Sequence, residues 1–348
     1  MSVTSQFIID HLDEWKNEIL SHSIDKQNAL EQAKLNNPWF TELEIERMLN
    51  SICNEYLERE KLLSWFNSYS YDQVKSNPKN IAIIAAGNIP LVGFHDMLCS
   101  IISGHSTQIK LSEKDKVLPV WIFDLLTQIN PSLKEKIKFV SQIKDFDAVV
   151  ATGSDLAGDH FKYYFGKYPH IIRSHRNGIA LLNGQESTSE IIQLGEDLFS
   201  YYGLGCRNVS KIYVPKDYDF IPLIKTLDEH FRYVRDLTKY FNNYEYNLAI
   251  HLLNRSKFLQ GDSCLFLEST LIPSRIAIVH YEYYDHLNIT FEEIKNSLDK
   301  IQCIVTNIPT SILPCQKLGS SQHPSLANYA DDMDTMKFLT QDIYSWND

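Results

Sequence analysis

Apolar residues recur every three or four positions through the first part of the chain. The first series is Phe7, Ile8, Leu12, Trp15, Ile19 and Leu20, and the second is Leu43, Ile45, Met48, Leu49, Ile52 and Leu57. This spacing puts one apolar stripe on each helix, so the sequence predicts helices through about residue 75. Between the two series, Thr41 stands three residues before Glu44. That pair predicts a capping box at the start of the second helix.

Short apolar runs alternate with helical stretches from residue 81 onward. We expect strands at residues 81–85, 107–111, 138–140 and 148–151, and helices at 93–103 and 117–129. Strands joined by helical crossovers form a parallel sheet with helices on both faces, and ligands bind at the carboxyl ends of such strands.

A helix at 186–200 and a strand at 211–215 begin another α/β region. Farther on, the spacing of Phe291, Ile294, Leu298 and Ile301 predicts a helix that leads to a strand at 303–306. The sequence therefore predicts an α/β fold in three parts. These are a helical segment at 1–75, a parallel-sheet domain at 76–185, and an α/β domain with a C-terminal return at 186–348.

The composition is that of an ordinary globular protein, with 44% hydrophobic and 22% charged residues among 348. A net charge of -11 argues against a surface that neutralises nucleic-acid phosphates, so we expect no nucleic-acid partner. The six cysteines lack metal-ligand spacing, which favours reduced thiols, no metal site and a cytoplasmic location. The acidic residues among the first twenty do not suit a signal peptide. The apolar window at 81–94 is too short to span a membrane.

Cys206 is the first candidate for chemistry. It lies in the segment Tyr201-Tyr202-Gly203-Leu204-Gly205-Cys206-Arg207-Asn208-Val209. Two glycines allow a tight turn that substrate can approach, and nearby positive charge or a helix dipole favours a thiolate. A buried structural cysteine is the alternative interpretation.

Three polar segments follow predicted strand ends. Asn88 comes after the first strand, and its side-chain amide is a candidate oxyanion donor, with a plain turn-forming role as the alternative. Lys110 lies near the end of the second strand, Ser112 and Glu113 follow it, and Thr152, Gly153 and Ser154 follow the fourth. The chain has neither a GxGxxG fingerprint nor a Walker loop, so no strong nucleotide motif supports these segments. Each is also compatible with a solvated turn.

Taken in order, these segments resemble those of the aldehyde dehydrogenase superfamily. That superfamily carries an Asn-Phe-Pro-type oxyanion loop, a Lys-Pro-Ser-Glu cofactor loop, a Thr-Gly-Ser turn and then the catalytic cysteine. The segment around Cys206 is still more similar to that of the LuxC-type fatty acyl-CoA reductases, as are residues 319–326 and 329–336. The resemblance covers about residues 35–340. It implies an aldehyde dehydrogenase-like fold with a nucleotide-binding domain at 76–185 and a catalytic domain at 186–348.

The chain departs from the superfamily pattern at two positions. Aldehyde dehydrogenases that use water carry a glutamate base where this chain has residues 173–180, which contain no carboxylate. Its absence favours acyl transfer involving a thiol such as CoA over hydrolysis. Leu111 replaces the usual proline of the cofactor loop. The resemblance also makes Glu282 a candidate for holding the nicotinamide ribose.

The resemblance implies reduction of an acyl-CoA, expected to be fatty, to the aldehyde through a thioacyl-cysteine on Cys206. The cofactor implied is NADPH, with NADH as the alternative. A homo-oligomer or an acyl-transferring partner is compatible with this activity. Two other classes stay open. One is a cysteine acyltransferase or thioesterase without nicotinamide that recruits His175 as base, and the other is a non-catalytic subunit of an acyl-reducing complex.

Overall fold

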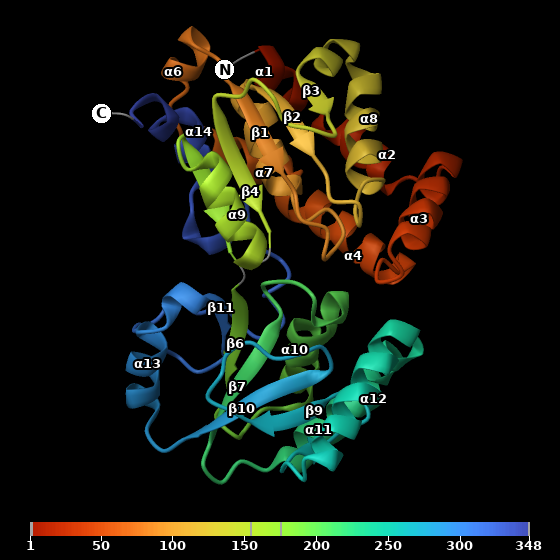
Figure 1. Ribbon diagram of the computed structural model, residues 1–348, viewed down its shortest axis with the longest axis vertical. Coiled ribbons are helices and arrows are strands. Elements are labelled where there is room, and N and C mark those ends of the chain that lie inside the picture. The colour runs from red at the N-terminus through yellow and green to blue at the C-terminus, as the bar shows by residue number, and fades with distance from the viewer. Residues whose placement is uncertain (1–2, 154, 175, 347–348) are drawn as a thin grey trace. The chain divides into compact units, whose positions relative to one another are not determined.

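The computed structural model describes residues 3–153, 155–174 and 176–346. It divides into two units, one formed by Met1–His175 and Pro324–Asp348 and the other by Arg176–His323. We call them the first unit and the second unit. In Figure 1 the C-terminal segment, in blue, lies beside the red and orange N-terminal helices of the first unit.

The first unit contains most of the helices. They are α1 (Val3–Asp10), α2 (Leu12–Leu20), α3 (Ile24–Asn36), α4 (Glu42–Ser51), η1 (Ile52–Tyr56), α5 (Arg59–Phe66), α6 (Asp72–Ser76), α7 (Phe94–Ser103), α8 (Leu118–Ile129), η2 (Pro131–Glu135), α9 (Asp155–Phe165), η6 (Ala330–Asp332), α14 (Thr335–Thr340) and η7 (Asp342–Tyr344). Its strands are β1 (Asn80–Ile84), β2 (Ser106–Lys110), β3 (Ile137–Phe139), β4 (Ala148–Thr152) and β5 (His170–Arg173).

These five strands form one parallel sheet in the order β3-β2-β1-β4-β5. Alternate residues of β1 face opposite sides of it, as the two-residue period of a strand requires. Ile81 and Ile83 join the large core formed with α7, α8 and the N-terminal helices, whereas Ala82 packs in a smaller core with Phe161 and Phe165 of α9. The predicted α/β fold with a parallel sheet is confirmed, and the predicted strands and helices between 81 and 152 agree with the observed ones to within one residue.

The C-terminal segment returns to the first unit through polar contacts. The Tyr329 hydroxyl accepts a hydrogen bond from Trp65 Nε1 at 2.8 Å and lies 2.8 Å from the Tyr69 hydroxyl, which donates to Asp334. Arg173, at the end of β5, forms a buried ion pair with Asp96 of α7. Its Nη2 also donates to the hydroxyl of Thr335 at 2.7 Å. The returning segment is thus part of this unit's core.

The second unit contains a six-stranded sheet and four longer helices. The strands are β6 (Asn177–Leu181), β7 (Val209–Pro215), β8 (Leu259–Gln260), β9 (Leu265–Glu268), β10 (Ile278–Tyr284) and β11 (Ile301–Val305). The helices are α10 (Thr188–Phe199), η3 (Ser200–Gly203), α11 (Phe220–Phe231), η4 (Arg232–Asp236), α12 (Thr238–Leu253), α13 (Leu287–Lys295) and η5 (Leu298–Lys300). The sheet order is β11-β6-β7-β10-β9-β8, and β8 alone pairs antiparallel within it. Phe291 and Ile294 of α13 pack on Ile179 and Ile304.

Two local predictions were wrong in detail. Thr41 precedes α4 as expected, but its side chain makes no capping hydrogen bond, and Glu44 is buried beside Arg47. The capping box that does form is that of Ser187 and Glu190, at the start of α10. Ile301 begins β11 and does not continue a helix, because its side chain is buried in the sheet's core.

No helix in the described ranges is long and apolar enough to cross a membrane.

Candidate active site

Cys206 lies in a four-residue turn, residues 205–208, directly before β7. The Asn208 N–H donates to the Gly205 carbonyl at 3.1 Å and closes the turn. The Asn208 side-chain oxygen accepts a hydrogen bond from the Gly205 N–H at 2.8 Å. Both ends of the turn are therefore tied to one buried asparagine, while Cys206 itself is half-buried. We call residues 205–208 the Cys206 turn.

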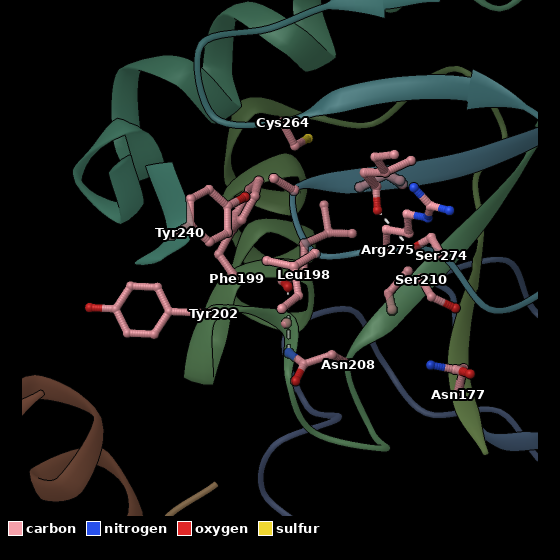
Figure 2. A pocket seen from close by; sticks show the side chains of 16 residues that line it. Asn177, Leu198, Phe199, Tyr202, Asn208, Ser210, Tyr240, Cys264, Ser274 and Arg275 are labelled. Atoms are coloured by element: carbon pink, nitrogen blue, oxygen red, sulfur yellow. Dashed lines mark hydrogen bonds between the residues drawn. The ribbon is translucent and has the colours of Figure 1, made fainter. Parts of the chain in front are cut away.

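The same asparagine binds the C-terminal end of α10. Its Nδ2 donates to the carbonyls of Ser200 at 2.9 Å and Asp197 at 3.1 Å, which a helix end leaves without intrahelical partners. Figure 2 shows Asn208 at the start of β7, pointing toward Leu198. Because a helix C-terminus carries partial negative charge, this helix end does not favour a thiolate. The positive charge that the sequence provides next to Cys206 is Arg207.

Strands β6 and β11 support the turn from the other side. The Gly178 N–H donates to the Asn208 carbonyl at 2.9 Å. A Cβ at Gly178 would lie 2.7 Å from the Arg207 carbonyl oxygen, so the backbone approach requires glycine. Cys303 of β11 contacts that same oxygen through its thiol at 3.4 Å. The start of β6, where the superfamily's base was expected, thus lies against the Cys206 turn.

The other five thiols are less suited to nucleophilic chemistry. Burial raises the pKa of each of them, to about 12 for Cys53 and Cys303. The thiolate is the nucleophile, and a raised pKa reduces its population. Burial therefore lowers the thiolate fraction of these five cysteines.

Asp197 connects α10 to the Gly-Ser-Ser segment that the sequence analysis singled out near the C-terminus. One carboxylate oxygen accepts the Gly319 N–H at 2.6 Å and the other accepts the Ser321 N–H at 2.9 Å. Burial raises the pKa of Asp197 to about 6, although both N–H groups oppose the shift. With both oxygens engaged and the residue fully buried, this carboxylate is not available as a base for water.

Asn88 belongs to the first unit and follows β1. Lys110 ends β2, which pairs with β1, and Ser112 and Glu113 follow it. Parallel strands place their carboxyl ends at one edge of the sheet, so these segments share that edge, as predicted. Lys110 and Glu113 are exposed, and Ser112 is half-buried. A cation, a hydroxyl and a carboxylate at this edge fit the hydroxyl and phosphate groups of a nucleotide.

Thr152 ends β4, on the other side of β1, and Gly153 follows it at the same edge. A Cβ at Gly153 would lie 2.9 Å from the Cβ of Ala157, so the strand passes closely into α9. Ser154 and His175, which the sequence analysis proposed for the cofactor and as an alternative base, lie outside the described residues.

Glu282 is not brought together with Cys206. It pairs with Tyr213, four residues into β7 and therefore about 13 Å along the strand from its start beside the turn. Its carboxylate forms an ion pair with Lys211, whose side chain is fully buried and also donates to the Thr270 carbonyl at 2.9 Å. Within the second unit, Glu282 thus neutralises a buried lysine.

The small cavity of Figure 2 lies behind Asn208, between the end of α10 and β10. Its volume is about 40 Å³, room for roughly three water molecules but not for an acyl chain. The aromatic clusters at residues 161–165 and 281–284 do not line it. Tyr163 and Tyr164 are 83% and 66% exposed on α9, and Tyr281 packs on Phe220.

Sequence reasoning missed three residues that organise these loops: Asp115, Asp197 and Asn208. Asn208 stood in the quoted cysteine segment, two residues after Cys206, and its residue type was a usable signal. The two aspartates gave no usable signal, because they accept hydrogen bonds from backbone N–H groups of loops elsewhere in the chain.

Solved structures with a similar fold are aldehyde dehydrogenases. Aldehyde dehydrogenase 21 from Physcomitrella patens, in complex with the reaction product succinate, is 12% identical, with a TM-score of 0.63 over 98% of this chain and 83% of that one. A mutant form of Bacillus cereus aldehyde dehydrogenase is 11% identical, with a TM-score of 0.60 over 88% and 72% of the two chains. NADP-dependent glyceraldehyde-3-phosphate dehydrogenase from Bacillus halodurans C-125, complexed with NADP, is 12% identical, with a TM-score of 0.55 over 86% and 73%.

The chain therefore has the aldehyde dehydrogenase fold. The model of the acyl-CoA reductase (LuxC) family matches residues 4–221, which include Asn88 and Cys206. The chain belongs to that family, and it is an enzyme of the acyl-CoA reductase type. A sequence search of curated proteins finds no match.

Asp115, which follows the Glu113 segment, predicts a pH effect on stability. Burial raises its pKa from an ordinary 3.8 to about 7, against the hydrogen bond it accepts from the Leu91 N–H. The folded state therefore binds this proton more tightly, and stability is lost as pH rises from about 4 to 7. We expect Asp115→Asn to gain stability relative to wild type over that range, on the order of 4 kcal/mol by pH 8.

Urea unfolding at pH 4.5 and pH 8 measures this difference. Asp124→Asn, which makes the same charge change on an exposed position of α8, is the control and should show no such pH-dependent gain. Equal behaviour of the two variants would contradict the assignment.

Proposed function

We propose that this enzyme reduces an acyl-CoA thioester to the aldehyde with a nicotinamide cofactor, NADPH in preference to NADH, through a thioacyl intermediate on Cys206. The observation that carries the proposal is the Cys206 turn, a half-buried thiol in a turn that Asn208 fixes at both ends. A fixed nucleophile lowers the entropic part of the barrier to attack.

The Cys206 thiolate would attack the thioester carbonyl carbon, and the C–S bond to CoA would break as CoA leaves. The Asn88 amide and the Cys206 N–H are the proposed donors to the oxyanion formed in this step. The reduced nicotinamide supplies a hydride to the acyl carbon when bound. Collapse of the resulting thiohemiacetal would release the aldehyde and regenerate the Cys206 thiolate.

The proposed nucleotide site comprises Lys110, Ser112, Glu113, Thr152 and Gly153, with Ser154 as its undescribed member. Their place at the carboxyl edge of a parallel sheet supports this assignment, because such edges bind nucleotides. Glu282 is a weaker member of the set, since its carboxylate already pairs with Lys211.

The test is incubation of the purified enzyme with acetyl-, octanoyl- or hexadecanoyl-CoA and either NADPH or NADH. We expect aldehyde release in equal amount to cofactor oxidation, and faster turnover with NADPH. A parallel incubation without nicotinamide is the control. If the control without nicotinamide releases free fatty acid and CoA as fast as the complete mixture consumes acyl-CoA, the result would instead support a thioesterase.

A further inference from the structure

The Asn88 loop, residues 87–91, and the loop at 110–115 form one packed junction. The Ala85 N–H donates to the Lys110 carbonyl at 3.0 Å, so pairing between β1 and β2 continues up to the loops. A Cβ added at Gly87 would lie 2.9 Å from both Cβ and Oγ of Ser112. The loops therefore touch with no space for another carbon atom.

A single buried carboxylate crosses this junction. Oδ2 of Asp115 accepts the Leu91 N–H at 2.7 Å, and the Asp115 N–H donates to the Ser112 carbonyl at 3.1 Å. Asp115 is 4% exposed, and its Oδ1 has no hydrogen-bond partner among the described residues. A buried carboxyl with one unbonded oxygen costs stability, and an apolar residue of similar size would avoid that cost.

The hydrogen bond from the Leu91 N–H to Asp115 holds a residue with an unfavourable backbone conformation. The φ of Leu91 is 54°, in the left-handed region that is sterically unfavourable for leucine, and its side chain is buried. The Leu91 carbonyl then accepts the Phe94 N–H at 2.9 Å, at the start of α7. Holding the Leu91 N–H thus sets the path of the chain three residues after Asn88.

We infer that Asp115 is a positioning residue that fixes the Asn88 loop against the loop at 110–115 and so holds the Asn88 amide for acyl transfer to Cys206. This inference rests on the proposed function, in which Asn88 is an oxyanion donor. It assigns Asp115 no contact with substrate. Under this inference, the proposed nucleotide-binding loop and the Asn88 loop hold each other in place.

The experiment measures the rate of Cys206 acylation by mass spectrometry, without nicotinamide, using whichever of acetyl-, octanoyl- and hexadecanoyl-CoA acylates the wild type fastest. Asn88→Ala should slow acylation by ~10²–10³-fold. Asp115→Ala should slow it by about 10- to 100-fold, because the donor is misplaced. Asp115→Asn should stay within about threefold, since its amide oxygen still accepts the Leu91 N–H.

The decisive variant is Asp115→Ala combined with Asn88→Ala. If Asp115 acts through Asn88, the double variant acylates no more slowly than Asn88→Ala alone. Multiplied effects, or a normal rate in Asp115→Ala, would overturn the inference. Leu126→Ala, a buried change in α8 away from both loops, is the control for destabilisation and should leave the acylation rate unchanged.

Gly87→Ala provides a second route if Asp115→Ala does not fold, because it pushes on the same junction from the other loop. It should slow acylation in the wild type and have no further effect in Asn88→Ala. Failure of the proposed function has a different signature, namely no acyl adduct on Cys206 in the wild type.

Discussion

Cys206→Ser is expected to lose acyl-CoA reduction by at least ~10³-fold while binding nicotinamide nearly as well as the wild type. A serine hydroxyl is a far weaker nucleophile than a thiolate without a base to activate it, and removal of a nucleophile is among the largest single effects in enzymes. The proposed nucleotide-binding loops lie on the first unit, whereas Cys206 lies on the second. Steady-state kinetics and a fluorescence titration with NADPH measure the two properties.

Cys315→Ser is the matched control for that variant. Cys315 is also half-buried in the second unit, and burial raises the pKa of its thiol. This control should keep wild-type activity. Appreciable acyl-CoA reduction by Cys206→Ser would remove Cys206 from the mechanism, and loss of activity in both variants would point to a general effect of thiol removal.

The acyl adduct on Cys206 is expected to persist in the absence of reduced cofactor. Water beside a thioester is a poor nucleophile without a positioned proton acceptor, an effect of ~10²–10⁴ in rate. The start of β6 lies against the Cys206 turn and carries Asn177 and Gly178, not a carboxylate. Asp197 is committed to the N–H groups of Gly319 and Ser321.

Intact-protein mass spectrometry after mixing with acyl-CoA tests this. The adduct should map to Cys206 and disappear as aldehyde when NADPH is added. Asp197→Asn tests the excluded carboxylate, and it should leave the adduct's hydrolysis rate unchanged. Rapid conversion to free fatty acid without cofactor would contradict the reductase and favour a thioesterase, with His175 as the first residue to substitute.

Local apolar patterns were sufficient to predict the first sheet. Strands β1 and β2 and helices α7 and α8 lie within one residue of their predicted ends. The spacing of apolar residues within each segment, with a period of two for a strand or 3.6 for a helix, is enough to identify the element. The order of strands and crossovers also placed Asn88, Ser112 and Thr152 at strand ends, and the parallel sheet puts those ends at one edge.

The same patterns do not reveal a side-chain partner that is distant in the chain. Arg173 forms a buried ion pair with Asp96, and its guanidinium also donates a hydrogen bond to the Thr335 hydroxyl. Glu282, a candidate for the nicotinamide ribose, forms an ion pair with Lys211 of the neighbouring strand. Neither ion pair has a spacing that a sequence can display. The first joins the end of β5 to helix α7, and the second depends on the register of β7 and β10.

The sequence by itself determined the α/β class, the parallel sheet, and the segments that carry the candidate chemistry, because these depend on short-range periodicity and on residue type. Only the tertiary structure decided how those segments are held. The Cys206 turn depends on one asparagine reaching the end of a helix, and the Asn88 loop depends on a buried aspartate from the next crossover. A hydrogen bond between irregular backbone and a distant side chain is created by the packing around it, so it has no signature until the chain is folded.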